Sequence, residues 1–179
     1  MSRVIDLEEA RLNLLAKRGF RNWEGHFEEE FGVHTKVSDL SMKTLAKLAQ
    51  GKEKSNFYLY DLIICLRGAG SGFDLNQLKA KEKMAVIDRY LFLLDRIRFE
   101  CMKRLGWLQD FPGEEYTIVD LIVRFESLAP GLQAEVPNIG NDHPERETFA
   151  GMNTSEKEAF IRKMIPAALK EMENYSTTR

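Results

Sequence analysis

The chain has 179 residues, which is enough for one hydrophobic core and short for two. Hydrophobic residues make up 44% and charged residues 30%, as in ordinary globular domains and unlike disordered chains. Lys and Arg number 26 against 28 Asp and Glu, and a net charge of −2 gives no general attraction for nucleic acid or anionic lipid. We therefore expect a single helical domain, residues 1–179, with nucleic acid unlikely as a partner.

The N-terminal half of the sequence predicts three helices. Apolar residues at helical spacing predict an amphipathic helix over residues 3–17, which Gly19 ends or bends. Aromatic residues then recur at steps of three and four and predict a second helix over residues 20–31. Residues 38–50 follow with Ser and Asp as N-terminal caps and Gly51 as the residue after the helix.

Two apolar segments follow, and the second is the clearest element of the chain. The run 57–66 fits a buried helix or a buried strand, and helix is favoured because no other segment offers a strand to pair with it. Residues 81–105 contain no Gly or Pro and end before Gly106, which predicts a long helix with a left-handed residue after it. A heptad seam from Met84 to Leu105 and a second apolar stripe beside it indicate a central helix packed on several sides.

The C-terminal third predicts two more helices and a long connection. A capping box opens a helix over residues 117–128, which we expect Pro130 to end. Residues 130–153 are rich in Pro, Gly, Asn and Asp and predict a long irregular loop. The last helix, 154–175, contains Pro166, and we expect it to be the least firmly held element, able to detach. The predicted fold class is all-α, an irregular bundle of about six or seven helices around a long central helix.

The sequence predicts neither a membrane span nor a secreted protein. The longest strongly apolar run, 57–66, is about half of the roughly 20 residues that cross a bilayer. Residues 1–10 include acidic side chains where a secretory signal needs a continuous apolar stretch, so we expect a cytoplasmic location. Cys65 and Cys101 have apolar neighbours that predict structural thiols, and the cytoplasm favours their reduced state over a disulfide, which the sequence leaves open.

Two motifs resemble binding sites but have simpler explanations. The glycine-rich turn 68–72 fits neither a dinucleotide-binding nor a P-loop spacing, and a flexible connection explains it. His26, Glu30 and His34 stand at steps of four and would share one face of a continuous helix, but Gly32 interrupts that helix. We expect solvated surface residues there, and we expect no metal and no cofactor.

Charged residues inside apolar elements are the most informative anomaly. Asp61 lies within the run 57–66, and the central helix carries Asp95, Arg98 and Glu100. Buried ions are costly unless they are paired. These residues therefore form internal ion pairs, or extend outward to solvent, or line a polar pocket between helices 57–66 and 81–105. We take the four as candidate ligand-binding residues and predict that Arg98 pairs with Asp95 or Asp61.

Two classes of function fit these observations. The favoured class is a non-enzymatic interaction or regulatory module, with a protein partner or a second copy of the chain, because packing signals dominate the sequence. The alternative is a small-molecule-binding protein or an enzyme that uses the predicted polar pocket. A concave pocket lined by the four charges would favour the alternative, whereas enclosed ion pairs without a cavity would favour the first class.

Overall fold

The computed structural model of the protein describes residues 6–176, which form nine α-helices, two 3-10 helices and one two-stranded antiparallel sheet. The all-α prediction is confirmed, with more helices than expected. None of these helices is long and apolar enough to cross a membrane. The α-helices are α1 (Leu7–Gly19), α2 (Arg21–Phe27), α3 (Met42–Ala49), α4 (Glu53–Leu66), α5 (Ala80–Arg104), α6 (Ile118–Val123), α7 (Phe125–Ala134), α8 (Arg146–Ala150) and α9 (Thr154–Ser176). The shorter elements are η1 (Val37–Asp39), η2 (Gly72–Gln77), β1 (Leu108–Asp110) and β2 (Asn138–Ile139).

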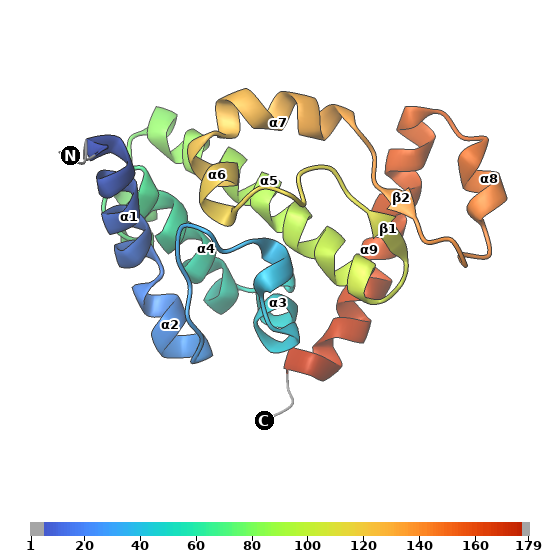
Figure 1. The fold of residues 1–179 in the computed structure, drawn as a ribbon, viewed down its shortest axis with the longest axis horizontal. Helices are drawn as coiled ribbons and strands as arrows, with labels where there is room; N and C mark the ends of the chain where they lie inside the picture. Colours follow the sequence, from blue (N-terminus) through green and yellow to red (C-terminus); the bar gives the residue numbers. More distant parts are fainter. Residues whose placement is uncertain (1–5, 177–179) are drawn as a thin grey trace, which may run out of the picture.

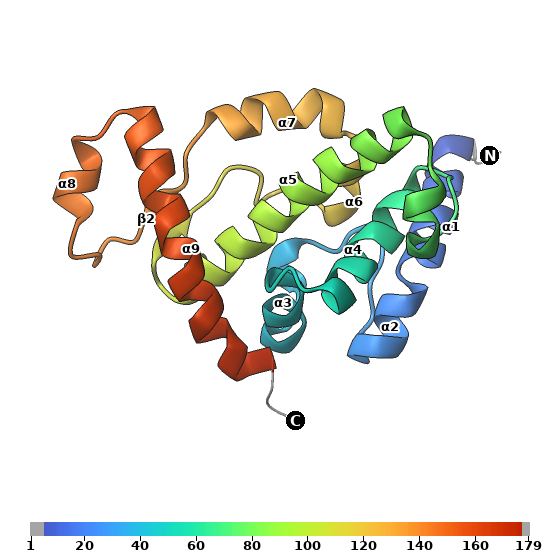
Figure 2. The same cartoon turned by 180° about the vertical axis from the view of Figure 1, so that it is seen from behind.

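The long helix α5 runs through the middle of the molecule and contacts α3, α4, α6, α9 and β1. Figure 1 shows α1 and α2 at one end of the molecule and α8 at the other, with α7 along one side. Figure 2, from behind, shows α9 crossing the C-terminal end of α5. The prediction of a central helix packed on several sides is therefore confirmed, and Gly106 has the predicted left-handed backbone, with φ of 81°.

The second apolar stripe of α5 is buried along its length, whereas the heptad seam is buried only in its second half, at Leu94 and Cys101. Val86, Leu93 and Ile97 are fully buried, whereas Met84 and Leu91 of the seam are 55% and 54% exposed. The neighbouring helices cover α5 on the side of the second stripe, so the first half of the seam faces solvent. The seam is thus not a coiled-coil contact within this chain.

Residues 53–66 are a helix, as predicted for the run 57–66. Helices α1 and α2 pack closely against it. A Cβ atom on Gly19 would lie 2.8 Å from Leu62 Cδ1, so glycine lets the end of α1 approach α4 closely. Trp23 Nε1 donates a hydrogen bond to the carbonyl oxygen of Tyr58 at 2.8 Å and fixes α2 to the same helix. The predicted beginning of the first helix at residues 3–5 lies outside the described residues.

Three predicted boundaries are wrong. The second helix ends at Phe27 because Glu28 has a left-handed backbone with φ of 56°, yet Phe31 still stacks on Phe20 at a ring-centroid distance of 5.5 Å. The helix predicted over 117–128 is two helices, α6 and α7, which meet at Arg124. Helix α7 continues through Pro130 to Ala134.

The position of Pro130 explains why it does not end α7. Proline lacks the N–H that would bond to the carbonyl four residues earlier, here that of Glu126. Pro130 and Glu126 are both exposed, so solvent can satisfy the carbonyl that loses its donor. A proline on the outer face of a helix therefore costs less than one on a buried face.

The segment 130–153, predicted as one long irregular loop, is interrupted by three regular elements. This segment completes α7 and contains β2 and α8. Strand β2 pairs with β1 through Leu108 and Ile139, and the buried Phe149 fastens α8 to α9, with its ring centroid 5.5 Å from that of Phe160. Apolar residues at wide intervals thus order a segment whose overall composition is typical of a loop.

The buried apolar residues form two clusters that share α5. The main cluster contains residues of α1, α2, α3, α4 and α6, which pack on one side of α5. The second cluster joins the C-terminal end of α5 to β1, β2, α8 and α9 through Phe99, Met102, Ile139, Phe149 and Ile161. Helix α9 belongs to both clusters, because its fully buried Met172 packs in the main one.

The two cysteines are buried and free, as the structural interpretation predicted. Cys65 is 5% exposed and Cys101 is fully buried. Burial raises the pKa of Cys101 to about 12, so this side chain stays a neutral thiol at physiological pH. Both cysteines therefore act as small apolar core residues.

Candidate functional site

Asp61, the first predicted site residue, lies in a contact between α4 and its neighbours. Its side chain is buried, and its carboxylate accepts hydrogen bonds from Asn22 Nδ2 at 2.9 Å and from the backbone N–H of Gly72 at 3.0 Å. A Cβ atom on Gly72 would meet the ring of Phe57 at 3.0 Å. Asp61 therefore ties α2 and the end of the glycine-rich turn to α4, away from the other three candidates.

Arg98 is not ion-paired with either carboxylate that the sequence suggested. Its Nε donates to the carbonyl oxygen of Ala49 at 2.9 Å, at the C-terminal end of α3. Asp95 is instead bound by Arg162 of α9, and Asp61 by the contacts described above. The prediction of an Arg98 pair with Asp95 or Asp61 is therefore wrong.

Glu100 lies in a third environment. It is 5% exposed, and its Oε1 accepts a hydrogen bond at 3.0 Å from Arg104 one helical turn later. Its Oε2 has no hydrogen-bond partner among the described residues. The four predicted residues thus lie in separate contacts, and the structure does not bring them together between α4 and α5. Of the four, only Asp95 lines the cavity described next.

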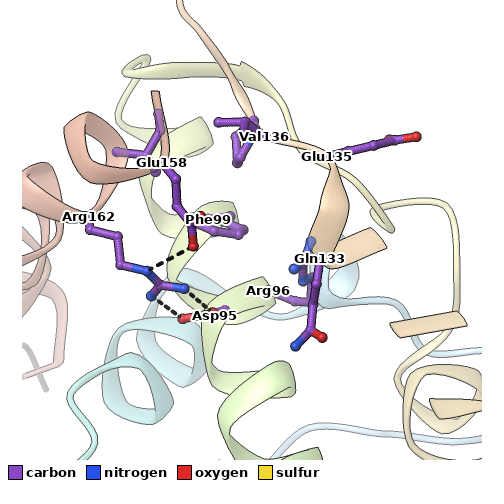
Figure 3. A pocket seen from close by; sticks show the side chains of 10 residues that line it. Asp95, Arg96, Phe99, Gln133, Glu135, Val136, Glu158 and Arg162 are labelled. Carbon is purple, nitrogen blue, oxygen red and sulfur yellow. Dashed lines mark hydrogen bonds and ion pairs between the residues drawn. The ribbon is translucent and has the colours of Figure 1, made fainter. Parts of the chain in front are cut away.

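This cavity, with a volume of about 130 Å³, lies between α5, the end of α7, the segment leading to β2, and α9 (Figure 3). A cavity of about 150 Å³ accommodates benzene, so this one has room for a molecule of about six non-hydrogen atoms. Phe99, Val136 and Ile161 provide apolar walls. The charged residues that line it are Asp95, Arg96, Glu135, Glu158 and Arg162.

Arg96 is the most unusual of these residues, because it is charged and only 3% exposed. Its Nη1 donates to the carbonyl oxygen of Pro112 at 2.5 Å, and its Cζ lies 4.7 Å from the ring centroid of Phe92 and 5.1 Å from that of Phe99. Its Nε has no acceptor within residues 6–176. Burial lowers the pKa of Arg96 to about 10, which nearby Asp95 opposes and Arg162 reinforces. The cavity therefore borders a buried cation that has no hydrogen-bonded carboxylate among the described residues.

A fork-shaped ion pair beside the cavity joins α5 to α9. Arg162 Nη1 and Nη2 donate to Asp95 Oδ1 and Oδ2 at 2.9 and 2.7 Å, and this hydrogen bonding raises the pKa of Arg162. Arg162 Nε is 3.9 Å from Glu158 Oε1, which is too long for a hydrogen bond. Both oxygens of Asp95 are therefore occupied, whereas the Glu158 carboxylate keeps capacity to accept hydrogen bonds.

The charged walls come from different elements. Figure 3 shows Asp95 and Arg96 on α5 and Arg162 and Glu158 on α9, while the side chain of Glu135 points away from the cavity. Guanidinium groups stay protonated at neutral pH, so they recognise charge and do not transfer protons. This arrangement can bind a small charged molecule between α5 and α9.

The three residues considered as metal ligands are not brought together. His26 Nε2 lies 2.5 Å from Lys47 Nζ, and its ring stacks on Tyr58 at 4.7 Å, while Glu30 and His34 line a separate hollow beside α1. Burial lowers the pKa of His26, and the positive charge of Lys47 lowers it further. Throughout the described part of the chain, no group of three or more His, Cys, Asp or Glu side chains is arranged to hold a metal ion.

Sequence reasoning missed Arg96 and Arg162. A signal for Arg96 exists, because Phe92 and Phe99 stand four residues before it and three after it, which places all three on one face of α5. An arginine between aromatic residues on a buried face suggests a charge enclosed by the fold. Arg162 has no such signal, because its role depends on how α9 docks.

The fold and the site define the chain as an all-α protein with a small charged cavity between its central and C-terminal helices. We find no protein-family model that matches the chain, and no curated protein or solved structure with significant similarity to it.

Proposed function

We propose that this protein is a non-enzymatic regulatory module that binds a small charged molecule in the cavity between α5 and α9. The observation that carries the proposal is Arg96, a residue that is 3% exposed, that lines the cavity and whose Nε lacks an acceptor within the described residues. Buried arginines ordinarily have a carboxylate partner, because an uncompensated buried charge is costly. A ligand carboxylate in the cavity would supply that counter-charge.

The position of the cavity supports a regulatory role. Its walls include Asp95 and Arg96 from α5 and Glu158 and Arg162 from α9, so a ligand would contact both helices only when α9 is docked. A ligand that binds one arrangement of two elements stabilises that arrangement. Ligand binding would thus control whether the C-terminal helix is held or released, in a cytoplasmic protein as the sequence suggested.

A titration followed by 1H–15N NMR tests this proposal. Sodium acetate, sodium phosphate, L-alanine and methylammonium chloride serve as separate probes at pH 7. We expect at least one to shift signals of α5 and α9 around the cavity in a saturable way, and we expect Arg96→Met to abolish the effect. Arg98→Met is the matched control, because Arg98 is a half-buried arginine of the same helix outside the cavity. Absence of saturable shifts with every probe would refute the proposal.

A second candidate function is self-association through α1. Leu7 and Leu14 are 79% and 69% exposed and lie one heptad apart on the same face. The first turn of α1 is acidic at Glu8 and the last turn is basic at Lys17, so an antiparallel α1 of a second copy would place opposite charges beside the apolar stripe. Sedimentation equilibrium should then show a weak dimer that Leu14→Glu dissociates. A wild-type monomer at millimolar concentration would exclude this candidate.

A further inference from the structure

Two charged residues at the cavity, Arg96 and Glu158, lack a full ion-pair partner within the described residues, and their charges are opposite in sign. From them we infer that the ligand is a zwitterion, a small α-amino acid whose carboxylate lies beside Arg96 and whose ammonium group lies at Glu158. This inference rests on the proposed ligand-binding function and adds the chemical class of the ligand. It depends on which charges are already paired, on their placement across the cavity, and on the volume available.

Because the side chain of Glu135 points away from the cavity, the Asp95–Arg162 pair leaves one positive and one negative group there without a full partner. Both oxygens of Asp95 accept hydrogen bonds from Arg162. Within residues 6–176, the hydrogen-bonding and cation–π partners of Arg96 are a neutral carbonyl and two aromatic rings. The Glu158 carboxylate, on a side chain that is 60% exposed, reaches no closer than 3.9 Å to the guanidinium of Arg162. A ligand with both charges can therefore satisfy groups that the protein itself does not.

The placement of the two groups disfavours ligands with a single charge. Arg96 belongs to α5 and Glu158 to α9, so the ligand lies between the helices (Figure 3). A simple anion beside Arg96 would be repelled by Asp95 and Glu158, and a simple cation beside Glu158 would be repelled by Arg96 and Arg162. A zwitterion offsets both repulsions, because its carboxylate is attracted to Arg96 while its ammonium group is attracted to Glu158.

The volume limits the size of the amino acid. At about 130 Å³ the cavity holds about six non-hydrogen atoms, which corresponds to alanine. The apolar walls from Phe99, Val136 and Ile161 suit a methyl group and offer no partner to a charged or polar side chain. Amino acids with long side chains therefore fit less well than alanine or glycine.

Isothermal titration calorimetry at pH 7 with L-alanine, sodium acetate and methylammonium chloride tests the ligand class. We expect L-alanine to bind at least about tenfold more tightly than either single-charge probe, the effect of one additional charge-assisted hydrogen bond. Glu158→Gln should weaken L-alanine about tenfold and leave acetate binding unchanged or tighter. Glu171→Gln, an exposed glutamate of the same helix that does not line the cavity, is the matched control and should leave both unchanged.

The outcomes separate this inference from the function on which it rests. If acetate binds as tightly as L-alanine, or if Glu158→Gln leaves L-alanine binding intact, the zwitterion inference fails while the ligand-binding function stands. If no probe binds to the wild-type protein, both fail. Circular dichroism of each variant confirms that the fold is kept, which we expect because the substituted side chains are exposed.

Discussion

Replacement of Arg96 by methionine separates a structural role of this residue from a binding role. Methionine keeps an unbranched apolar side chain in place of the aliphatic part of arginine and removes the charge. Because Arg96 is only 3% exposed, the substitution changes the interior of the protein and not its surface. If the guanidinium holds the fold together, its loss should be costly, whereas a residue kept for ligand binding can be lost with little change in stability.

Two opposing contributions of Arg96 to the free energy of unfolding can be compared, and the first is the cost of burying its charge. Burial lowers the pKa of Arg96 to about 10, about 2.5 below its ordinary value. At 1.36 kcal/mol per pKa unit, the charged side chain destabilises the folded protein by about 3 kcal/mol. The folded state binds fewer protons than the unfolded state only above about pH 10, so stability rises with pH there and the full penalty applies at pH 7.

The causes of this pKa shift are burial, Asp95 and Arg162, and further contacts of Arg96 that are not among them offset the penalty. A hydrogen bond from a charged donor to the carbonyl oxygen of Pro112 contributes about 1.5–3 kcal/mol. The rings of Phe92 and Phe99 contribute about 0.5–1 kcal/mol each. The contributions nearly cancel, so we expect Arg96→Met to change the free energy of unfolding at pH 7 by less than about 1 kcal/mol.

Arg89→Met is the matched comparison, because Arg89 is an equally buried arginine of α5 with a full set of partners. Its guanidinium donates to the carbonyl oxygens of Ile122 and Ala85 at 3.1 and 3.0 Å and pairs with Glu126 at 3.4 Å. We expect its loss to cost about 2–3 kcal/mol, since a buried carbonyl is left without its donor. Urea unfolding followed by circular dichroism measures both variants. A loss of about 3 kcal/mol for Arg96→Met, equal to that of Arg89→Met, would refute the reasoning.

Three further outcomes follow from contacts elsewhere in the structure. Gly140→Ala should lower the free energy of unfolding by more than about 2 kcal/mol, because a Cβ atom would lie 2.4 Å from a backbone carbonyl oxygen. Gly25→Ala, where a Cβ atom has open space around it, should not be destabilising, and equal melting temperatures of the two variants would contradict this reasoning. Asp95→Asn should cost about 1 kcal/mol at low salt and less at high salt, since its partner Arg162 is 49% exposed, and an unchanged cost in 1 M salt would argue against an ion pair. Amide hydrogen exchange should be faster in α9 than in α5, and the reverse order would show that the C-terminal helix is the more firmly held.

Local signals in the sequence predicted the elements whose ends are set by neighbouring residues. Ser41 Oγ accepts a hydrogen bond from the backbone N–H of Thr44 at 3.2 Å, and Gly51 has a left-handed backbone with φ of 65°, as the caps of α3 require. Gly106 likewise follows α5. Caps and periodicity act within one or two turns of chain, so they can be read without knowledge of tertiary contacts.

The predictions failed where tertiary packing overrides local preference. Pro130 is tolerated because its face of α7 is exposed, which depends on where α7 lies on the molecule. The segment 135–153 is ordered by Ile139 and Phe149, whose burial depends on β1 and α9. Composition cannot distinguish such a segment from a loop, because only a few widely spaced residues carry its contacts.

The candidate site could not be predicted because its two walls meet only through long-range packing. Asp95 and Arg162 are 67 residues apart in the sequence and come together where α9 crosses α5. Helix α5 contributes residues to the main apolar cluster along most of its length and to the second cluster at its C-terminal end. Phe99, which lines the cavity, belongs to the second cluster. A cavity beside this junction has one wall on the central helix and one on the terminal helix. A ligand that pairs with the charged groups of this cavity would contact both helices. Ligand binding would therefore also hold α9 against α5.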